Sequence, residues 1–546
     1  MSFKLDKNCK INSMYLITIF LPALMAGMIA FFYATKWDIH IIKLPVWNDE
    51  AAYYAQVKML LMHGVSAGYW GFGGGHALVG TGGAWSAAIL LPYVLFGKLF
   101  GWTYTSISIA NVVFMCIANA LFLRLVKASK EVCIRFFFVE LFSIHLWLYT
   151  NTQMSEVLRY AMAIVLAGVL YHLFFEEHNP AWFQILAGVY LLYLMQAYIF
   201  FSFAVMLYVF ALMKKTKSFW KKASAGFATM AIAAGGSYYV LHLISSNYNI
   251  FKTERLLNCL KAHDIFGAVK AFIWMAKVGL YDLYVCFRSS TGYGLFHYFV
   301  PAIIFFCVVS VVLMIVRSTR AKGEQHVETE AGASLAKEGK ILAITAYTMI
   351  LYVGMYVTVY SLEAFTFFRG MGIPLLFCLA LLCCLDQYNV YILFFLAYAL
   401  ALFFLPANIK AFNEERYVLP EKVQEWDALA DKLENTFTLT EVEQAARNES
   451  DSIEKNRWDN TIILFTMEPR VIASLPAGFG QNYMMYEETL PDAKAGYLFF
   501  SMKQTGLRGD WLEHSYFSVY QQNRDLIEAN YFIQYTDGDY VIYKHK

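Results

Sequence analysis

Two neighbouring carboxylates, Asp49 and Glu50, follow the first long apolar segment of this 546-residue chain. The preceding Asn48 is a favoured helix N-cap, so the sequence predicts a helix that begins at the two acids and runs to about His63. An aspartate at a helix N-terminus stays ionised, because the positive end of the helix dipole stabilises its charge. Asp49 is therefore suited to binding a cation, to orienting a ligand or to acting as a weak base.

The predicted helix has an apolar face that contains Ala51, Tyr54, Val57 and Leu61. This pattern is typical of a helix that lies along a membrane surface. The simplest explanation of the two acids is that acidic residues favour helix N-termini. A carboxylate at a membrane boundary is costly, however, and usually has a function. The acidic pair is therefore our first candidate for a functional site.

The composition is that of a membrane protein. The chain is 59% hydrophobic and only 15% charged, whereas soluble domains carry about 25% charged residues. Its apolar residues form blocks of about 20 residues, the length that a membrane-spanning helix needs. The net charge of +2 does not indicate nucleic acid as a partner. Nine cysteines without a CxxC pair argue against a zinc site and against a disulfide scaffold.

Loop charges and apolar blocks predict the topology. Lysines before the first span, Tyr15–Ala34, place the N-terminus in the cytoplasm, and about eleven spans then place the C-terminus outside. Residues 36–103 form a first outer loop and residues 245–291 a second, while residues 317–340 are expected to be a disordered cytoplasmic linker. The expected fold over residues 1–405 is thus an α-helical polytopic membrane protein with helices on its outer surface.

Residues 406–546 differ from the rest of the chain. Charge returns there, residues 414–443 have a helical pattern, and short β-like runs occur at 461–465, 497–500 and 540–543. We expect a small extracytoplasmic α/β domain.

Other candidate residues face the same compartment as Asp49 in this topology. Glu156 and Arg159 are three residues apart at the start of a span, so they either pair on one helix face or shape a site. Arg369 lies near the outer end of a late span, where the alternative role is anchoring at lipid headgroups. Arg288 lies in the second outer loop, where a solvated charge is the alternative. His76 belongs to a glycine-rich stretch that lacks phosphate-loop spacing, and loop histidines are usually uninvolved in function.

These motifs together resemble the GT-C superfamily of polyprenyl-phosphate-sugar glycosyltransferases, such as protein O-mannosyltransferases and lipid A aminoarabinose transferases. Asp49-Glu50 with Tyr54 is similar to the acidic pair in the first outer loop of that superfamily. Residues 83–101, GAWSAAILLPYVLFGKLFG, resemble its proline-bearing surface helix. Residues 154–160, MSEVLRY, resemble the group that opens its fourth span, and residues 367–374, FFRGMGIP, resemble its arginine before a proline.

The resemblance implies transfer of a sugar from a polyprenyl-phosphate donor in the bilayer to an extracytoplasmic glycan, lipid or protein. By analogy, Asp49 is the base and Glu50 orients the acceptor. Arg369 is the first candidate for holding the lipid phosphate, and Arg288 is a weaker one. The other candidate substrate-binding residues are Tyr54, His76, Glu156 and Arg159. No cofactor is firmly indicated, and Asp49 and Glu50 are the candidate ligands if the reaction uses Mg²⁺ or Mn²⁺.

Two other functions fit a membrane protein of this size. A secondary transporter or flippase would carry ionisable groups near the bilayer midplane and two related halves. The spans here are poor in such groups, and we find no internal repeat. A non-catalytic scaffold that displays the C-terminal domain would leave the long first outer loop unexplained.

Overall fold

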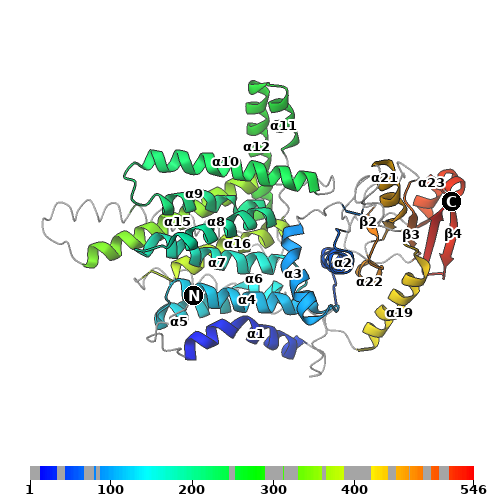
Figure 1. Cartoon of the computed structure of the whole chain (residues 1–546), viewed down its shortest axis with the longest axis horizontal. Helices are drawn as coiled ribbons and strands as arrows, with labels where there is room; N and C mark the ends of the chain where they lie inside the picture. The colour runs from blue at the N-terminus through cyan, green and yellow to red at the C-terminus, as the bar shows by residue number, and fades with distance from the viewer. Residues whose placement is uncertain are drawn as a thin grey trace.

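The computed structural model describes residues 13–33, 44–66, 79–80, 87–244, 253–288, 312, 330–359, 364–385, 420–440, 450–466, 468–483, 494–502 and 516–546. Three parts follow one another along the long axis of the molecule (Figure 1). A bundle of long helices comes first, two helices that cross the bundle axis come next, and a small domain with a β-sheet forms the far end. The crossing helices are α2 (Asn48–His63) and α3 (Ala87–Phe100).

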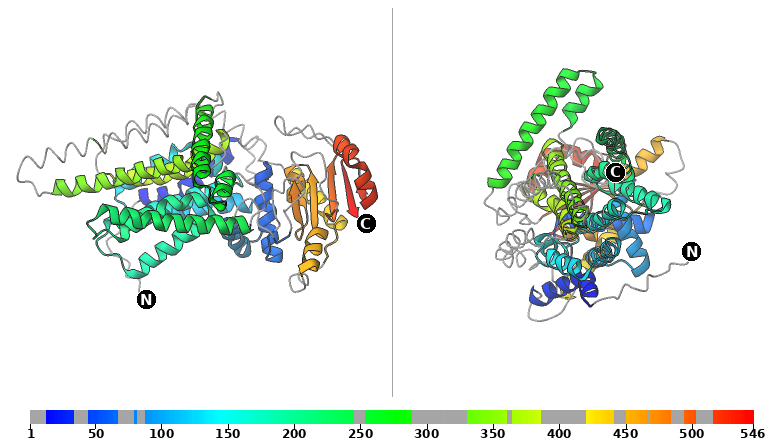
Figure 2. Two further views of the ribbon diagram at one scale, coloured as in Figure 1. Left: turned by 90° about the horizontal axis from the view of Figure 1, so that it is seen from above. Right: turned by 90° about the vertical axis from the view of Figure 1, so that its left-hand side faces the viewer.

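The bundle consists of apolar helices that run roughly along the long axis (Figures 1 and 2). In chain order these helices are α1 (Ser13–Tyr33), α4 (Ser106–Leu125), α5 (Lys130–Leu141), α6 (Ile144–Tyr149), α7 (Glu156–Phe175), α8 (Ala181–Ala197), the 3-10 turn η2 (Ile199–Ser202), α9 (Phe203–Leu212), α10 (Phe219–Ile244), α15 (Glu330–Thr358) and α16 (Ala364–Leu382). Helix α7 is the most deeply buried of the long apolar helices and packs against both α4 and α16.

The helical character agrees with the sequence, but the count of about eleven spans is not confirmed. Among the described residues, four helices are long and apolar enough to cross a membrane: Ser13–Phe31, Ser106–Leu125, Glu156–Phe175 and Lys337–Thr358. Shorter apolar helices, such as Ala181–Ala197 and Arg369–Leu382, pack among them.

Two segments that the sequence placed in loops are helical. Residues 330–340, assigned to a disordered linker from their composition, form the first turns of α15. Here Glu338 is buried and the ammonium of Lys337 lies 5.5 Å from the centre of the Tyr171 ring, so these polar residues have protein neighbours. The remainder of that linker, residues 317–329, lies outside the described residues. Within the expected second outer loop, α11 (Glu254–Lys261) and α12 (Ile265–Arg288) form a helical hairpin.

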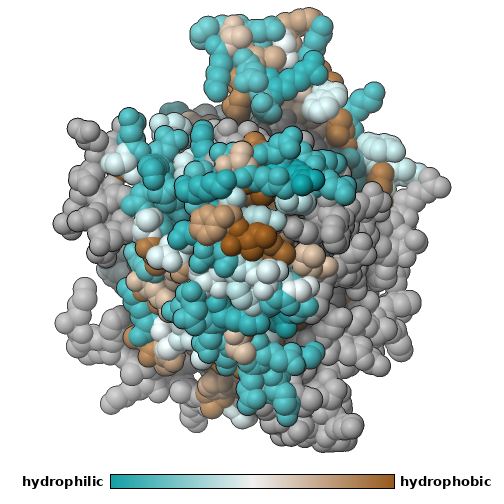
Figure 3. Space-filling view, turned by 90° about the vertical axis from the view of Figure 1, so that its right-hand side faces the viewer, coloured by the Kyte–Doolittle hydropathy of each residue, from teal (hydrophilic) through white to brown (hydrophobic). Residues whose placement is uncertain are grey.

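The C-terminal domain is built on a five-stranded mixed sheet with the order β2-β1-β3-β5-β4. Its strands are β1 (Thr461–Phe465), β2 (Gly480–Tyr483), β3 (Tyr497–Ser501), β4 (Tyr531–Thr536) and β5 (Tyr540–His545), accompanied by α19 (Pro420–Thr436), α21 (Ser450–Asp459), α22 (Pro469–Ser474) and α23 (Tyr516–Asn530). Strand β1 is parallel to both β2 and β3, whereas β5 is antiparallel to β3 and β4. The face of this domain at the end of the molecule is mostly hydrophilic (Figure 3).

Helix α2 lies between the bundle and the C-terminal domain (Figure 1). On one side Leu61 of α2 packs so closely on Gly97 of α3 that a Cβ at Gly97 would lie 2.8 Å from Leu61 Cδ1. On the other side Lys58 Nζ donates to the Leu475 carbonyl at 3.2 Å, and the Gly478 N–H points at Met59 Sδ at 2.9 Å. The expectation of a single buried face on this helix is therefore wrong, because the C-terminal domain covers the opposite face, while its place at the membrane surface stays a prediction.

The turn between β4 and β5 is held by one carboxylate. Asp537 accepts hydrogen bonds from the Tyr535 hydroxyl at 2.6 Å, from Lys432 Nζ of α19 at 3.0 Å, and from the backbone N–H groups of Asp539 and Tyr540. Partial burial alone would raise the pKa of Asp537, but the bonds from Tyr535 and Lys432 outweigh it and hold the pKa well below its usual range.

We predict that Asp537→Asn destabilises the C-terminal domain by about 1–3 kcal/mol at pH 7, because charged hydrogen bonds are lost. Since the pKa is lowered by folding, this contribution is fully present above the unfolded pKa, about 4, and disappears as the pH falls further. Thermal proteolysis of the full chain measures the effect. The exposed Asp525→Asn is the control, and equal cleavage of both variants at pH 7 would contradict the assignment.

Candidate active site

The carboxylate of Asp49 lies in the first turn of α2 and faces the start of α16. Its Oδ2 accepts a hydrogen bond from Arg369 Nη1 at 3.2 Å, across 320 positions of sequence. The Asp49 side chain keeps 25% of its surface exposed, whereas Arg369 is buried. The predicted acid and the predicted phosphate-binding arginine are thus brought together as an ion pair.

Arg369 has a second acidic partner, on the central helix α7. Its Nε lies 3.3 Å from Glu156 Oε1, and Arg159 Nη1 donates to the same oxygen at 3.3 Å. The side chains of Glu156 and Arg159 are almost fully buried. Two carboxylates and two guanidinium groups therefore balance in charge, which a group of buried ions requires because removal from water is costly. We call Asp49, Glu156, Arg159 and Arg369 the charge cluster.

Tyrosines and glycines fix the position of Arg369. The Tyr160 hydroxyl donates to the Arg369 carbonyl at 2.7 Å, and the Tyr352 hydroxyl donates to the Gly370 carbonyl at 3.1 Å. A Cβ on Gly370 would lie 1.8 Å from the Tyr356 hydroxyl, and a Cβ on Gly372 would lie 2.6 Å from the Tyr160 ring. The glycines after Arg369 are therefore needed for the close packing of α16 on α7 and α15.

Arg159 is held on its other side by an aromatic ring. Its guanidinium carbon lies 4.5 Å from the centre of the Tyr198 ring, a cation–π geometry. The Tyr198 hydroxyl is in turn 3.1 Å from the Tyr356 hydroxyl. Arg159 is therefore held between the Glu156 carboxylate and the Tyr198 ring.

Glu50 anchors the start of α2. Its Oε2 accepts bonds from the Val46 and Trp47 N–H groups at 2.9 and 3.0 Å, and its Oε1 accepts one from the Gln153 N–H at 2.8 Å. Glu50 is completely buried. Because both oxygens already bind backbone amides, the geometry favours a positioning role over the predicted roles in orienting the acceptor or binding a cation. The helix starts at Asn48 and Trp47 holds the N-cap position, which corrects the predicted cap.

Tyr53, rather than Tyr54, lies beside the charge cluster. Tyr54 points toward the C-terminal domain side and stacks on the rings of Trp102 and Tyr104, each at 5.3 Å. Tyr53 is fully buried, and burial followed by the charge of Glu156 raises its pKa, so its phenol stays neutral. The sequence carried a signal for Tyr53 that we did not use, because it stands one helical turn after Asp49.

The remaining candidates cannot be placed at the site. His76 lies outside the described residues, and Arg288 is the last residue of α12 with a side chain outside the described part. In the described ranges, no three His, Cys, Asp or Glu side chains are grouped as metal ligands. Asp49 pairs with Arg369 and Glu50 accepts bonds from backbone amides, and their role as ligands of Mg²⁺ or Mn²⁺ stays a prediction.

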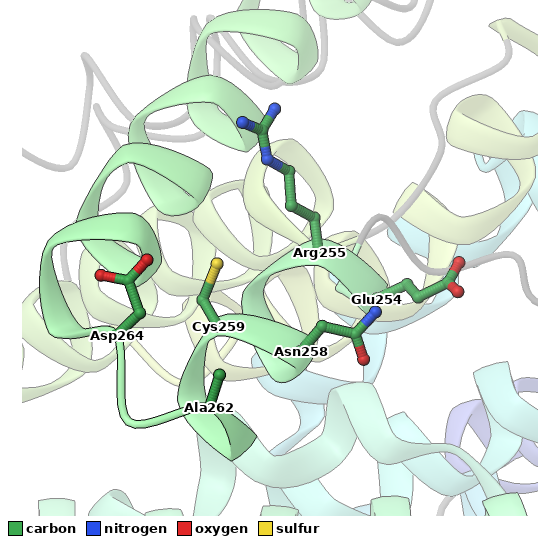
Figure 4. A pocket seen from close by; sticks show the side chains of 6 residues that line it. All are labelled: Glu254, Arg255, Asn258, Cys259, Ala262 and Asp264. Atoms are coloured by element: carbon green, nitrogen blue, oxygen red, sulfur yellow. The ribbon is translucent and has the colours of Figure 1, made fainter.

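One pocket lies away from the charge cluster, on the α11–α12 hairpin (Figure 4). It has a volume of about 440 Å³ and is lined by Glu254, Arg255, Asn258, Cys259, Ala262 and Asp264. None of these residues belongs to the charge cluster, so this pocket is a separate feature.

No protein-family model and no curated protein sequence match the chain. Among solved structures it is similar to an Archaeoglobus fulgidus oligosaccharyltransferase in complex with Zn and sulfate, with 10% identity, a TM-score of 0.45, and coverage of 97% of this chain and 73% of that one. It is also similar to ArnT from Cupriavidus metallidurans bound to undecaprenyl phosphate, with 9% identity, a TM-score of 0.39, and coverage of 96% and 97%.

We predict that Glu156→Gln strongly destabilises the bundle, by about 3–5 kcal/mol, because it leaves two buried guanidinium groups without their shared carboxylate. Thermal unfolding of the purified chain in detergent measures the loss. Glu131→Gln, at an exposed helix start, is the matched control. Combining Glu156→Gln with Arg159→Gln removes one charge of each sign and should recover part of the loss. A Glu156→Gln variant as stable as Glu131→Gln would contradict the charge balance.

Proposed function

We propose that this chain is an integral membrane glycosyltransferase that transfers a sugar from a polyprenyl-phosphate donor to an extracytoplasmic acceptor. The observation that carries this proposal is the position of Arg369, whose guanidinium is shared between the partly exposed Asp49 and the buried Glu156. A guanidinium is suited to a phosphate because its donors match two phosphate oxygens.

The donor phosphate binds Arg369 in place of the Asp49 carboxylate. Of the two acids on Arg369, Asp49 keeps 25% of its side-chain surface exposed and Glu156 only 3%, so the Asp49 pair is the one that an incoming anion can open. Glu156 stays in contact with Nε and keeps the guanidinium oriented. Arg159, whose guanidinium stacks on the Tyr198 ring, pairs with the same oxygen of Glu156. Phosphate binding therefore releases Asp49 at the place where the acceptor must arrive.

The released Asp49 acts as the base. It takes the proton of an acceptor hydroxyl as that oxygen attacks the anomeric carbon of the sugar. The bond from the anomeric carbon to the phosphate oxygen breaks, and its electron pair leaves with the lipid phosphate, whose charge Arg369 stabilises. A single displacement of this kind inverts the anomeric configuration. No step needs a metal ion.

The proposed topology follows from this chemistry. A lipid-linked donor reaches the site from the bilayer, so the charge cluster lies at the outer end of the spans. Residues 1–405 form the multi-pass transferase module with a cytoplasmic N-terminus. Residues 406–546, with their hydrophilic outer face (Figure 3), form the extracytoplasmic domain. The acceptor is an extracytoplasmic glycan, lipid or protein.

We predict that Asp49→Asn lowers kcat for sugar transfer by about 10²-fold or more and leaves the KM for the donor equal to that of wild type or lower, because the base is lost and the phosphate no longer competes with a carboxylate for Arg369. The assay uses purified protein, radiolabelled polyprenyl-phosphate sugars and a membrane extract as acceptor, with the exposed Asp451→Asn as control. Transfer that survives Asp49→Asn would remove Asp49 from the reaction. An inactive wild-type chain across the panel would favour a transporter or flippase.

We further predict that Lys58 positions α2 through the C-terminal domain. Burial lowers the pKa of Lys58, and its ammonium bonds the Leu475 carbonyl. Lys58→Met should lower kcat several-fold and speed proteolytic separation of the C-terminal domain, while Lys58→Arg should restore both. Wild-type kcat and proteolysis in Lys58→Met would contradict this role.

A further inference from the structure

The α11–α12 hairpin extends sideways from the bundle. Figure 1 and the right-hand view of Figure 2 both show α12 crossing the direction of the bundle helices. Gly279 of α12 lies against the Val357 carbonyl, where a Cβ would lie only 1.7 Å from the oxygen. Val357 is the residue before the end of α15, and α12 also contacts α16. The hairpin is therefore attached at the end of the bundle that carries Arg369.

One face of α12 is buried against the protein. Ala268, Ala271 and Met275 are nearly inaccessible and follow one another at helical spacing. Asp264 Oδ1 accepts the Gly267 N–H at 2.8 Å and so closes the first turn of the helix beside the pocket of Figure 4. The other faces of α12 contain exposed residues.

A second face of α12 is apolar and exposed. Ile265, Val269, Phe272, Ile273 and Leu280 are between 49% and 77% exposed. Their spacing of three, four and seven residues places them on one stripe, which we call the α12 stripe. An exposed apolar surface of this extent on a helix needs a partner.

A third face, beside the α12 stripe, carries the residue types of a membrane interface. Lys270 and Lys277 are seven residues apart and exposed, and Trp274 and Tyr281 lie on the same side. Lysine, tryptophan and tyrosine are the side chains that bridge acyl chains and headgroups. Helix α12 is not among the described helices that are long and apolar enough to span a membrane.

We propose that α12 lies in the plane of the bilayer, in the leaflet next to the charge cluster. The α12 stripe is buried among acyl chains, and Lys270 and Lys277 bind the phosphate groups of anionic lipids. A lipid fits better than a protein partner, because the two lysines border the apolar stripe along one side. In a leaflet the phosphate groups border the acyl chains in the same way. This proposal stands independently of the transferase activity.

Photo-crosslinking tests the place of the α12 stripe. The full chain, with a benzophenone amino acid at Ile273, is reconstituted in nanodiscs that contain radiolabelled phosphatidylglycerol and is irradiated. The control carries the same group at Asn258, in the polar pocket of α11. We expect labelled lipid on the Ile273 variant and little on the Asn258 variant. Equal labelling of the two, or a crosslink from Ile273 to a second copy of the chain, would overturn the proposal.

Native mass spectrometry tests the two lysines. The Lys270→Gln/Lys277→Gln variant should retain anionic phospholipid about thirtyfold less than wild type, since each of the two basic residues near a membrane surface contributes about 1 kcal/mol. Lys422→Gln/Lys455→Gln, in the C-terminal domain, removes the same charge and should retain lipid as wild type does. Equal retention by both variants would overturn the assignment of the lysines. A thermal unfolding curve of each variant checks that it is folded.

Discussion

The buried carboxylate of Glu156 is the group on which the site depends. Two guanidinium groups, those of Arg159 and Arg369, lie 3.3 Å from one of its oxygens. In a low-dielectric interior the cost of burying this carboxylate is offset only when both arginines are present. The cost of burying Arg369 is likewise offset only when a carboxylate pairs with it. Helices α7 and α16 are therefore held in a single register. That register leaves one edge of the Arg369 guanidinium directed at Asp49, which is where we propose that phosphate binds.

The second constraint is the set of contacts that fix the position of α2, the helix that carries Asp49. Glu50 ties its first turn to the Gln153 N–H, in the loop before α7. Further along, Lys58 and Met59 contact the C-terminal domain, and Tyr104 packs edge-on to Trp426 of α19 with 5.3 Å between ring centres. The sheet domain thus contacts α2, the helix that carries Asp49, directly through Lys58 and Met59. This connection gives the domain a physical means of influencing transfer.

Much of the charge cluster could be predicted from the sequence, because ionised residues stand out in an apolar chain. Asp49, Glu156, Arg159 and Arg369 were all identified from their places near span ends. The sequence could not show that Asp49 pairs with Arg369 while Glu50 anchors the helix start, because the second role depends on the distant backbone N–H of Gln153. The choice of Tyr53 over Tyr54 could have been made from helical spacing, because Tyr53 stands one turn after Asp49, but the cover of α2 by residues more than 400 positions away could not. The same cause hides the helical start of α15, whose polar residues look solvated until their neighbours are known.

The most direct test of the account is binding of a sugar-free polyprenyl phosphate to wild type, Asp49→Asn and Arg369→Gln in nanodiscs, because it separates phosphate binding from transfer. The account holds that Asp49 and the phosphate compete for one guanidinium. It therefore predicts that Asp49→Asn binds the lipid at least as tightly as wild type and that Arg369→Gln binds it much more weakly. Equal loss of binding in both variants, or full binding by Arg369→Gln, would contradict it.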